Sequence, residues 1–240
     1  VVTTAEMIRR NLQDTFALGA QKVSSIPTGV VAPDMPFRPE AKRRLLQRLG
    51  LPSKALLVGQ VSVLRSWKGQ YVLINAFERL APLVPESVLL LVGGGPVRDD
   101  YARRIRNSPV GHRILLVGHQ ENVWSFFRGM DVAVLASTRN EGIPQAGLQA
   151  MFAGCPFVGS DVGGIPEIVK HEHTGLLVRP GDADTLAAAM ERVLRHPEFG
   201  ALLAQNAQDM VRTTFTMEHM GHRMESLFQG LVATAKSKRD

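Results

Sequence analysis

Six short apolar segments alternate with amphipathic segments between residues 55 and 196, and this alternation constrains the fold more than any other feature of the chain. Segments such as ALLVGQVSVL and SVLLLVGG are apolar throughout, as strands buried on both faces are. Strict alternation of such strands with helices predicts a doubly wound α/β fold, in which helices cover both faces of a parallel sheet. The expected strands lie at residues 55–64, 87–94, 113–119, 131–137, 156–160 and 174–180.

Charge and composition narrow the class of protein. The chain has 28 Lys and Arg against 22 Asp and Glu, and the net charge of +6 favours anionic partners only weakly. No apolar run approaches the roughly 18 residues of a membrane span. We find no signal-peptide pattern, and the single Cys155 fits a reducing compartment, so we expect a cytoplasmic location. With two Trp, two Tyr and no aromatic–basic interleaving, nucleic-acid binding is not expected.

A basic segment, AKRRLLQRLG at residues 41–50, places leucines on one helical face and cations on the other. Such a face is most often simply solvated. Peripheral contact with an anionic membrane surface stays open as the alternative. The chain begins with Val rather than Met, and we therefore expect a fragment of a longer protein.

In a doubly wound sheet, ligands bind beyond the carboxyl ends of the strands. The first loop there reads RSWKGQ, and we expect Ser66 to cap the following helix, with Arg65 and Lys68 near its start. Cations are unfavourable at a helix N-terminus, so two of them there suggest a bound anion. Solvation, or pairing with a carboxylate, is the alternative for both side chains.

The loop after the second strand reads GGGPVR. It does not match the dinucleotide-binding pattern G-x-G-x-x-G, because the third glycine would fall on Arg98. Glycines such as Gly94 let a backbone approach a ligand closely, although a tight strand-to-helix turn explains them equally well. His119 follows the third strand and is expected on the same rim.

The stretch STRNEGIPQAGLQAMF follows the fourth strand and contains the most unusual residues. Glu141 stands just before a helix, and Gln145 and Gln149 share one helical face among small residues. An unpaired buried amide costs about 1–3 kcal/mol, so Gln149 needs either a hydroxylated ligand or a backbone carbonyl. Pro144 suits the first helical turn, so we expect Gly142 and Ile143 to offer free backbone amides just ahead of it.

Other common site chemistries are not indicated. His171 and His173 lie in a polar loop without a third ligand nearby, so no metal site is expected. Neither a Walker loop nor a nucleophile elbow with its Ser–His–Asp order occurs.

Several segments, taken together and in order, resemble the retaining GT-B glycosyltransferases of the "glycosyl transferases group 1" type, in their C-terminal, donor-binding half. IPTGVVAPDMPFRP resembles the family's interdomain segment, and VSVLRSWKGQYVLINAFERL resembles its "GRL…KG…LI.AF..L" segment. The remaining similar segments are LLVGGGP, DVAVLAS, GCPFVGSDVGGIPEIV and TGLLVRPGD. Each is weak alone, but their order and spacing make the resemblance specific.

The resemblance implies a Rossmann-like domain that holds a nucleotide-diphosphate sugar, with UDP favoured and no metal or other cofactor. It implies transfer with retention, of the hexosyltransferase type, to a glycan or lipid-linked acceptor, as in lipopolysaccharide or polysaccharide biosynthesis. By this analogy Arg65 and Lys68 neutralise the diphosphate, as preorganised charge stabilises a leaving group. Glu141 and the amides of Gly142, Ile143 and Gln145 hold the sugar, and Gln149 faces the ribose. The acceptor would bind to an N-terminal domain that this chain lacks.

Two positions depart from the family pattern. The family usually has Glu at both ends of an E-x(7)-E signature, and Gln149 occupies the second position here. An amide oxygen still accepts a hydrogen bond from a hydroxyl but without charge assistance. The family's usual Arg after the first strand is displaced, with Val63 in its column and Arg65 in its place. Two alternatives therefore stay open: a non-catalytic nucleotide-sugar-binding module, and a GT-B sugar-nucleotide epimerase.

The resemblance also divides the chain. We expect an interdomain helix and connector at residues 1–36 and the Rossmann-like donor domain at residues 37–200. Helices at residues 201–240 are expected to pack toward the missing domain.

Overall fold

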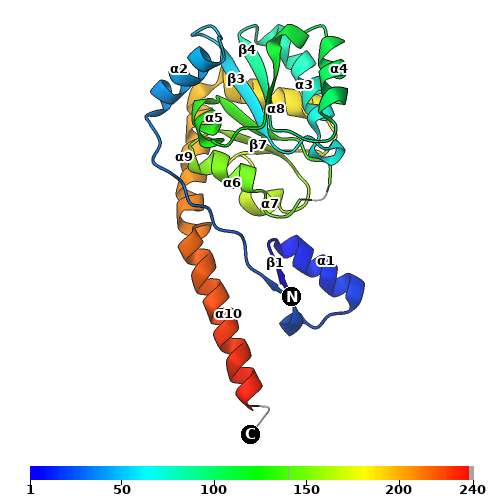
Figure 1. Cartoon of the computed structure of the whole chain (residues 1–240), viewed down its shortest axis with the longest axis vertical. Helices are drawn as coiled ribbons and strands as arrows, with labels where there is room; N and C mark the ends of the chain where they lie inside the picture. The colour runs from blue at the N-terminus through cyan, green and yellow to red at the C-terminus, as the bar shows by residue number, and fades with distance from the viewer. Residues whose placement is uncertain (140, 238–240) are drawn as a thin grey trace.

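The computed structural model describes residues 1–139 and 141–237 and contains a six-stranded parallel sheet. The strands lie in the order β5-β4-β3-β6-β7-β8, so the predicted α/β fold is confirmed (Figure 1). Every strand pairs in parallel with its neighbours, as strands joined by helical crossovers must. The strands are β3 (Leu56–Val61), β4 (Ser87–Val92), β5 (Ile114–Gly118), β6 (Val132–Leu135), β7 (Phe157–Ser160) and β8 (Leu176–Val178).

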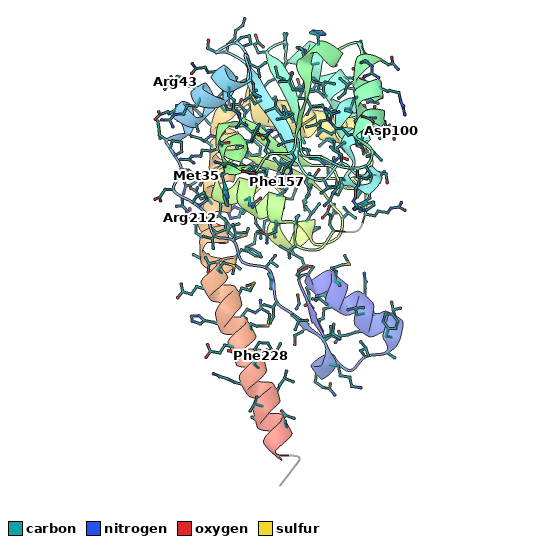
Figure 2. The ribbon with its side chains drawn as sticks, in the orientation of Figure 1. Met35, Arg43, Asp100, Phe157, Arg212 and Phe228 are labelled. Atoms are coloured by element: carbon teal, nitrogen blue, oxygen red, sulfur yellow. The ribbon has the colours of Figure 1, made fainter. Side chains whose placement is uncertain are left out.

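Helices cover both faces of the sheet because successive strand residues point to opposite sides. Leu57 and Leu90 belong to one buried cluster, and their chain neighbours Val58 and Leu89 belong to the other. Figure 2 shows Phe157 in the middle of the first cluster. That face is covered by α2 (Arg38–Arg48), α5 (Trp124–Gly129), α6 (Gln145–Phe152), α7 (Ile165–Ile168) and α9 (Pro197–Thr214); the opposite face is covered by α3 (Gln70–Leu83), α4 (Arg98–Arg106) and α8 (Ala183–Arg195).

Residues 1–25 form a small βαβ unit, which we call the N-terminal unit. It consists of β1 (Val2–Thr3), α1 (Glu6–Phe16), a 3₁₀ turn and β2 (Ser24–Ser25), and its two strands pair in parallel. Only a helix and a connector were expected here. Strands of two residues are too short to produce an apolar pattern, which explains why the sequence did not indicate them. An extended connector, residues 26–37, joins the unit to α2 (Figure 1).

The C-terminal part contains two helices with different surroundings. Helix α9 packs on α6 and α8, whereas α10 (Met217–Ser237) projects away from the sheet, with Phe228 on its surface (Figures 1 and 2). The expected division at residue 201 falls inside α9, and we propose that it lies instead between α9 and α10; residues 238–240 are outside the described part. No helix in that part combines the length and apolar character needed to cross a membrane.

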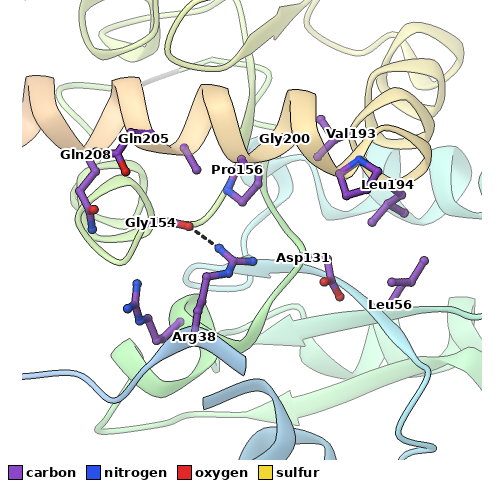
Figure 3. Close-up of a pocket in the computed structure, with 14 residues that line it drawn as sticks. Arg38, Leu56, Asp131, Gly154, Pro156, Val193, Leu194, Gly200, Gln205 and Gln208 are labelled. Atoms are coloured by element: carbon purple, nitrogen blue, oxygen red, sulfur yellow. Dashed lines mark hydrogen bonds between the residues drawn. The ribbon is translucent and has the colours of Figure 1, made fainter. Parts of the chain in front are cut away.

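Three side chains stabilise the C-terminal end of α6, at the amino edge of the sheet. Arg38 donates to the carbonyl of Gly154, Arg128 Nη1 to that of Ala153 at 2.8 Å, and Gln208 Nε2 to that of Phe152 at 2.7 Å. Two cations at a helix C-terminus also oppose the negative end of its dipole. These side chains line a cavity of about 430 Å³, and Figure 3 shows Arg38 reaching from α2 toward Gly154. The donors satisfy carbonyls that would otherwise have no helical partner.

Replacing Arg38 with Met should lower the free energy of unfolding by about 1–3 kcal/mol, because the carbonyls of Gly154 and Met130 both lose a charged donor. Arg43→Met on the same helix is the matched control, since its side chain is 70% exposed and meets only Glu40. We expect the control to cost under about 0.5 kcal/mol. Urea unfolding followed by circular dichroism measures both, and equal losses would contradict the role assigned to Arg38.

Candidate functional site

The strand order reverses between β3 and β6. From β3 the chain proceeds outward to β4 and β5, and it then returns to β6 on the other side of β3. In open parallel sheets the crevice at such a switch point is where ligands bind. The two loops that follow β3 and β6 carry the predicted residues Arg65, Lys68 and Glu141, so the topology brings them to one edge of the sheet.

Lys68 and Glu141 form a direct ion pair across this switch point. Lys68 Nζ lies 2.6 Å from Glu141 Oε1, although the residues are 73 positions apart. The Glu141 side chain is 5% exposed and that of Lys68 22%. Ser137 donates its hydroxyl to the same carboxylate oxygen. The carboxylate therefore keeps one oxygen committed to these donors, while Oε2 has no partner among the described residues.

The segment that carries Lys68 differs from the expected helix start. Residues Ser66–Lys68 form a 3₁₀ turn that begins after Arg65 and has no side-chain cap, and α3 begins only at Gln70. The predicted cap by Ser66 is therefore wrong. The turn is instead fastened to the loop after β6, because Trp67 accepts a backbone hydrogen bond from Thr138 at 2.8 Å.

Two buried glutamines, which the sequence analysis missed, hold this segment in place. Gln60 Nε2 donates to the carbonyl of Lys68 at 2.8 Å, and its Oε1 accepts from the amide of Ala136 at 3.2 Å. Gln70 Nε2 donates to the carbonyl of Val63 at 3.0 Å, and Gln70 Oε1 accepts from the Tyr101 hydroxyl at 3.0 Å. Gln60 is a polar residue inside an otherwise apolar strand, and that contrast was the available signal.

Tyr101 should make the stability of this network depend on pH. Burial raises the pKa of its hydroxyl to about 12, from 10 in the unfolded chain. The folded protein thus holds the proton more tightly, and stability contributed by Tyr101 is complete below pH 10 and decreases as the pH rises through 12. Urea unfolding at pH 9 to 11 measures this decrease. Tyr101→Phe should be less stable at pH 9 and show a smaller decrease; an unchanged slope would contradict the assignment.

Arg65, three residues before Lys68 in the chain, is exposed. Its guanidinium carbon lies 5.0 Å from the centre of the Trp67 ring, a cation–π contact. No carboxylate of the described residues lies within 4.0 Å of it. Arg65 is therefore a cation without a charged partner at the carboxyl end of β3.

The loop between β6 and α6 supplies backbone donors. Pro144 is the N-cap of α6, and the amides of Gly142, Ile143 and Gln145 donate no hydrogen bond to any described residue. Gln149 lies one turn further along α6 and is half-buried, and its side-chain amide has no hydrogen-bond partner among the described residues. Leu148 and Met151 of the same helix are buried in the core.

The other two predicted residues lie on the adjacent rim. Gly94 follows β4 and His119 follows β5, and a Cβ atom on Gly94 would lie 3.9 Å from that of His119. His119 is exposed. The cavity of Figure 3 lies at the opposite edge of the sheet, since Leu56 is the first residue of β3 and Asp131 and Pro156 directly precede β6 and β7.

A comparison with protein families gives one match that covers most of the chain. The sequence model described as "Glycosyl transferases group 1" matches residues 41–210, which include the whole sheet and nearly all of α9. The chain belongs to this family. The resemblance seen in the sequence is thereby confirmed.

Relatives of the chain are longer than it is. It is 27% identical over 194 residues to N-acetyl-alpha-D-glucosaminyl L-malate synthase of Bacillus anthracis, covering 81% of this chain and 50% of the relative. It spans 50–62% of the length of this and two further curated relatives. The chain therefore corresponds to only a part of each of these relatives.

Solved structures show the same fold. Anabaena Alr3699/HepE in complex with UDP-glucose superposes with a TM-score of 0.86 at 22% identity, over 96% of this chain and 63% of that one. The C-terminal domain of the glycosyl transferase group 1 family protein LpcC from Francisella tularensis superposes with a TM-score of 0.66 at 23% identity, over 73% of this chain and 93% of that domain. The sheet thus has the architecture of the C-terminal half of a GT-B fold.

Proposed function

We propose that this chain is the donor-binding part of a retaining glycosyltransferase that uses a nucleotide-diphosphate sugar. The observation that carries the proposal is the Lys68–Glu141 ion pair at the switch point of the sheet, with Arg65 on the same loop and without a carboxylate partner among the described residues. Family membership and the Anabaena complex with UDP-glucose support a UDP-type donor. The acceptor, a glycan or a lipid-linked sugar, would bind to a domain outside this chain.

The residues have separable parts in this proposal. Arg65 and Lys68 neutralise the diphosphate and the charge that develops on it as the glycosidic bond breaks, which is stabilisation by preorganised cations. Because Lys68 is already fixed by Glu141, little reorganisation is needed when the diphosphate arrives. The free carboxylate oxygen of Glu141 accepts hydrogen bonds from the sugar hydroxyls. Other hydroxyls of the sugar accept from the backbone amides of Gly142, Ile143 and Gln145. Gln149 accepts from a ribose hydroxyl, and Gly94 and His119 line the rim.

Titration calorimetry of the chain with UDP, GDP and ADP tests the proposal. We expect UDP to bind most tightly, and Arg65→Ala to weaken binding about tenfold, the effect of one charged contact. Arg43→Ala, an exposed arginine on α2, should bind UDP as the wild type does. The absence of heat with any of the three nucleotides at millimolar concentration would exclude the proposed donor site.

Gln149 favours a second candidate, a non-catalytic module that binds nucleotide sugars. Restoring the family's carboxylate by Gln149→Glu distinguishes the two, because a charged acceptor strengthens a hydroxyl contact about twofold in energy. If the site is functional with Gln149, we expect Gln149→Glu to change the Kd for UDP by less than about threefold. A gain of tenfold or more in calorimetry would indicate a site that has lost affinity and would support the non-catalytic module.

A further inference from the structure

Helix α1 of the N-terminal unit has no capping residue of its own. Its N-cap is Ala5, whose side chain cannot accept a hydrogen bond, although Ser, Thr, Asp or Asn is usual at this position. Glu6 in the first turn is engaged by Arg9 and Arg10. The first amides of α1 therefore depend on an acceptor from elsewhere in the chain.

That acceptor is Glu167, which is 160 residues distant in sequence. Its Oε2 accepts from the amide of Glu6 at 2.8 Å, and its Oε1 accepts from the amide of Met7 at 2.8 Å. Both oxygens of the carboxylate are thus used on one helix end, where the helix dipole also favours a negative charge. Across the described residues, these two are the only hydrogen bonds between residues 1–25 and the sheet with its covering helices.

Glu167 is connected to the proposed sugar site through its own backbone. It lies on α7, directly after the β7–α7 turn (residues 161–164), and the amide of Gly164 in that turn donates to the carbonyl of Glu141 at 3.1 Å. The turn and the loop after β6 touch closely, since a Cβ on Gly164 would lie 2.5 Å from the carbonyl oxygen of Gly142. The position of Glu167 is therefore tied to that of Glu141.

The start of α1 covers the other side of the same loop. A Cβ added to Gly142 would lie 2.8 Å from Thr4 Oγ1 and 3.5 Å from Ile8 Cδ1. The loop after β6 is thus enclosed between the N-terminal unit and the β7–α7 turn. The carboxylate of Glu167 fastens these two outer layers to each other.

We propose that Glu167 is a positioning residue that fixes the N-terminal unit against the sugar-binding loop. It would act through α1 on Gly142, without touching the donor, and this part of the inference rests on the proposed function of Glu141. Without the carboxylate, the unit keeps the hydrogen bond from Arg223 of α10 to the carbonyl of Ser25 and the apolar contacts of Ala5 and Ile8. These apolar contacts are not directional, so α1 becomes free to move relative to the sheet. The sugar part of a donor then loses one wall of its site, whereas the diphosphate contacts at Arg65 and Lys68 persist.

A distance measurement within the whole chain tests the positioning role without any ligand. Spin labels at Asp14→Cys on α1 and Lys170→Cys after α7 occupy exposed positions, and the native Cys155 is buried and does not react. We expect a single narrow distance distribution that broadens in Glu167→Gln, where an NH₂ group faces an amide donor, and in Glu167→Ala. Glu172→Gln is the matched control, because it removes an exposed carboxylate nearby whose one ion pair within the described part of the chain is with Arg192. A narrow distribution in both Glu167 variants would overturn the proposal.

A second variant separates positioning from simple helix capping. Ala5→Ser in the Glu167→Gln background gives α1 a local cap, and hydrogen exchange of residues 6–16 should then return to within about threefold of the wild-type rate. We expect the distance distribution to stay broad, since the new cap is not attached to the sheet domain. A narrow distribution in this double variant would show that Glu167 only caps α1, and would overturn the positioning role.

Calorimetry distinguishes this inference from the proposed function. With Glu167→Gln we expect the Kd for UDP to stay within about twofold and that for UDP-glucose to rise about fivefold, because only the sugar loses a contact. If wild-type chain binds neither ligand, the proposed function fails while the distance measurement still decides the positioning role. An equal change for both ligands would contradict action through the sugar-binding loop.

Discussion

Lys68→Met should weaken donor binding more than the removal of any other charged side chain at the proposed site. The change removes a cation from the proposed diphosphate site, a loss of about 30-fold or more in the affinity for UDP. It also leaves the Glu141 carboxylate, 5% exposed, with Ser137 as its only described partner. Removing one member of a buried ion pair costs about 3–5 kcal/mol, and the partial exposure of Lys68 places the expected loss of stability near the lower limit, about 3 kcal/mol.

The double variant Lys68→Met/Glu141→Gln separates the two effects. It removes both charges together, so no carboxylate is buried without a counter-ion, and stability should return to within about 1 kcal/mol of the wild type. Affinity for UDP should stay low, because the cation is still missing. Urea unfolding measures the stability, and calorimetry the affinity for UDP, of the wild type, the two single variants and the double variant. Simple addition of the two single losses of stability would show that Lys68 and Glu141 do not interact.

The fold followed from the sequence because strands such as 87–92 are apolar at every position, which only a sheet covered on both faces satisfies. The edge of the sheet that carries the candidate site also followed, since Lys68 and Glu141 both come after strands. Pairing of Lys68 with a carboxylate was one of the alternatives that the sequence left open, but the sequence did not identify Glu141 as the partner. The two residues are 73 positions apart in the sequence, and their charged groups come within 2.6 Å only because of the paths of the loops after β3 and β6. The spacing of residues along the chain does not encode these paths.

Contacts between distant segments account for the remaining differences. Ala5 is visible in the sequence as a poor N-cap, but nothing in the pattern identifies Glu167 as the group that replaces it. Ser66 is a good capping residue that caps nothing, because α3 begins four residues later. Gln60 was detectable as a polar residue inside an apolar strand, whereas Gln70 follows the stretch SWKG and has no apolar pattern around it. Only the fold shows that both are buried and together hold the segment of Lys68.

Gly69→Ala should destabilise the fold more than any other glycine substitution near the site. Gly69 joins the 3₁₀ turn of Lys68 to α3 with φ of +72°, and a Cβ there would lie 1.7 Å from the carbonyl oxygen of Ala136. That oxygen belongs to the backbone directly after β6, so it cannot move without displacing Ser137 and Thr138. Left-handed backbone costs Ala about 1–2 kcal/mol, and the steric conflict adds more, for an expected total of about 3–5 kcal/mol.

Gly50→Ala is the matched control for this prediction. Gly50 has a similar φ of +65°, but nothing lies within 4 Å of a Cβ at that position, so only the backbone strain of about 1–2 kcal/mol applies. Urea unfolding gives the difference between the two variants, which measures the contact between Gly69 and Ala136 alone. UDP binding should be lost in Gly69→Ala and retained in Gly50→Ala, because only the first displaces Lys68 from Glu141. Equal stability of the two variants would mean that the contact between Gly69 and Ala136 does not hold the segments after β3 and β6 together. This contact would then not explain why Lys68 lies so close to Glu141.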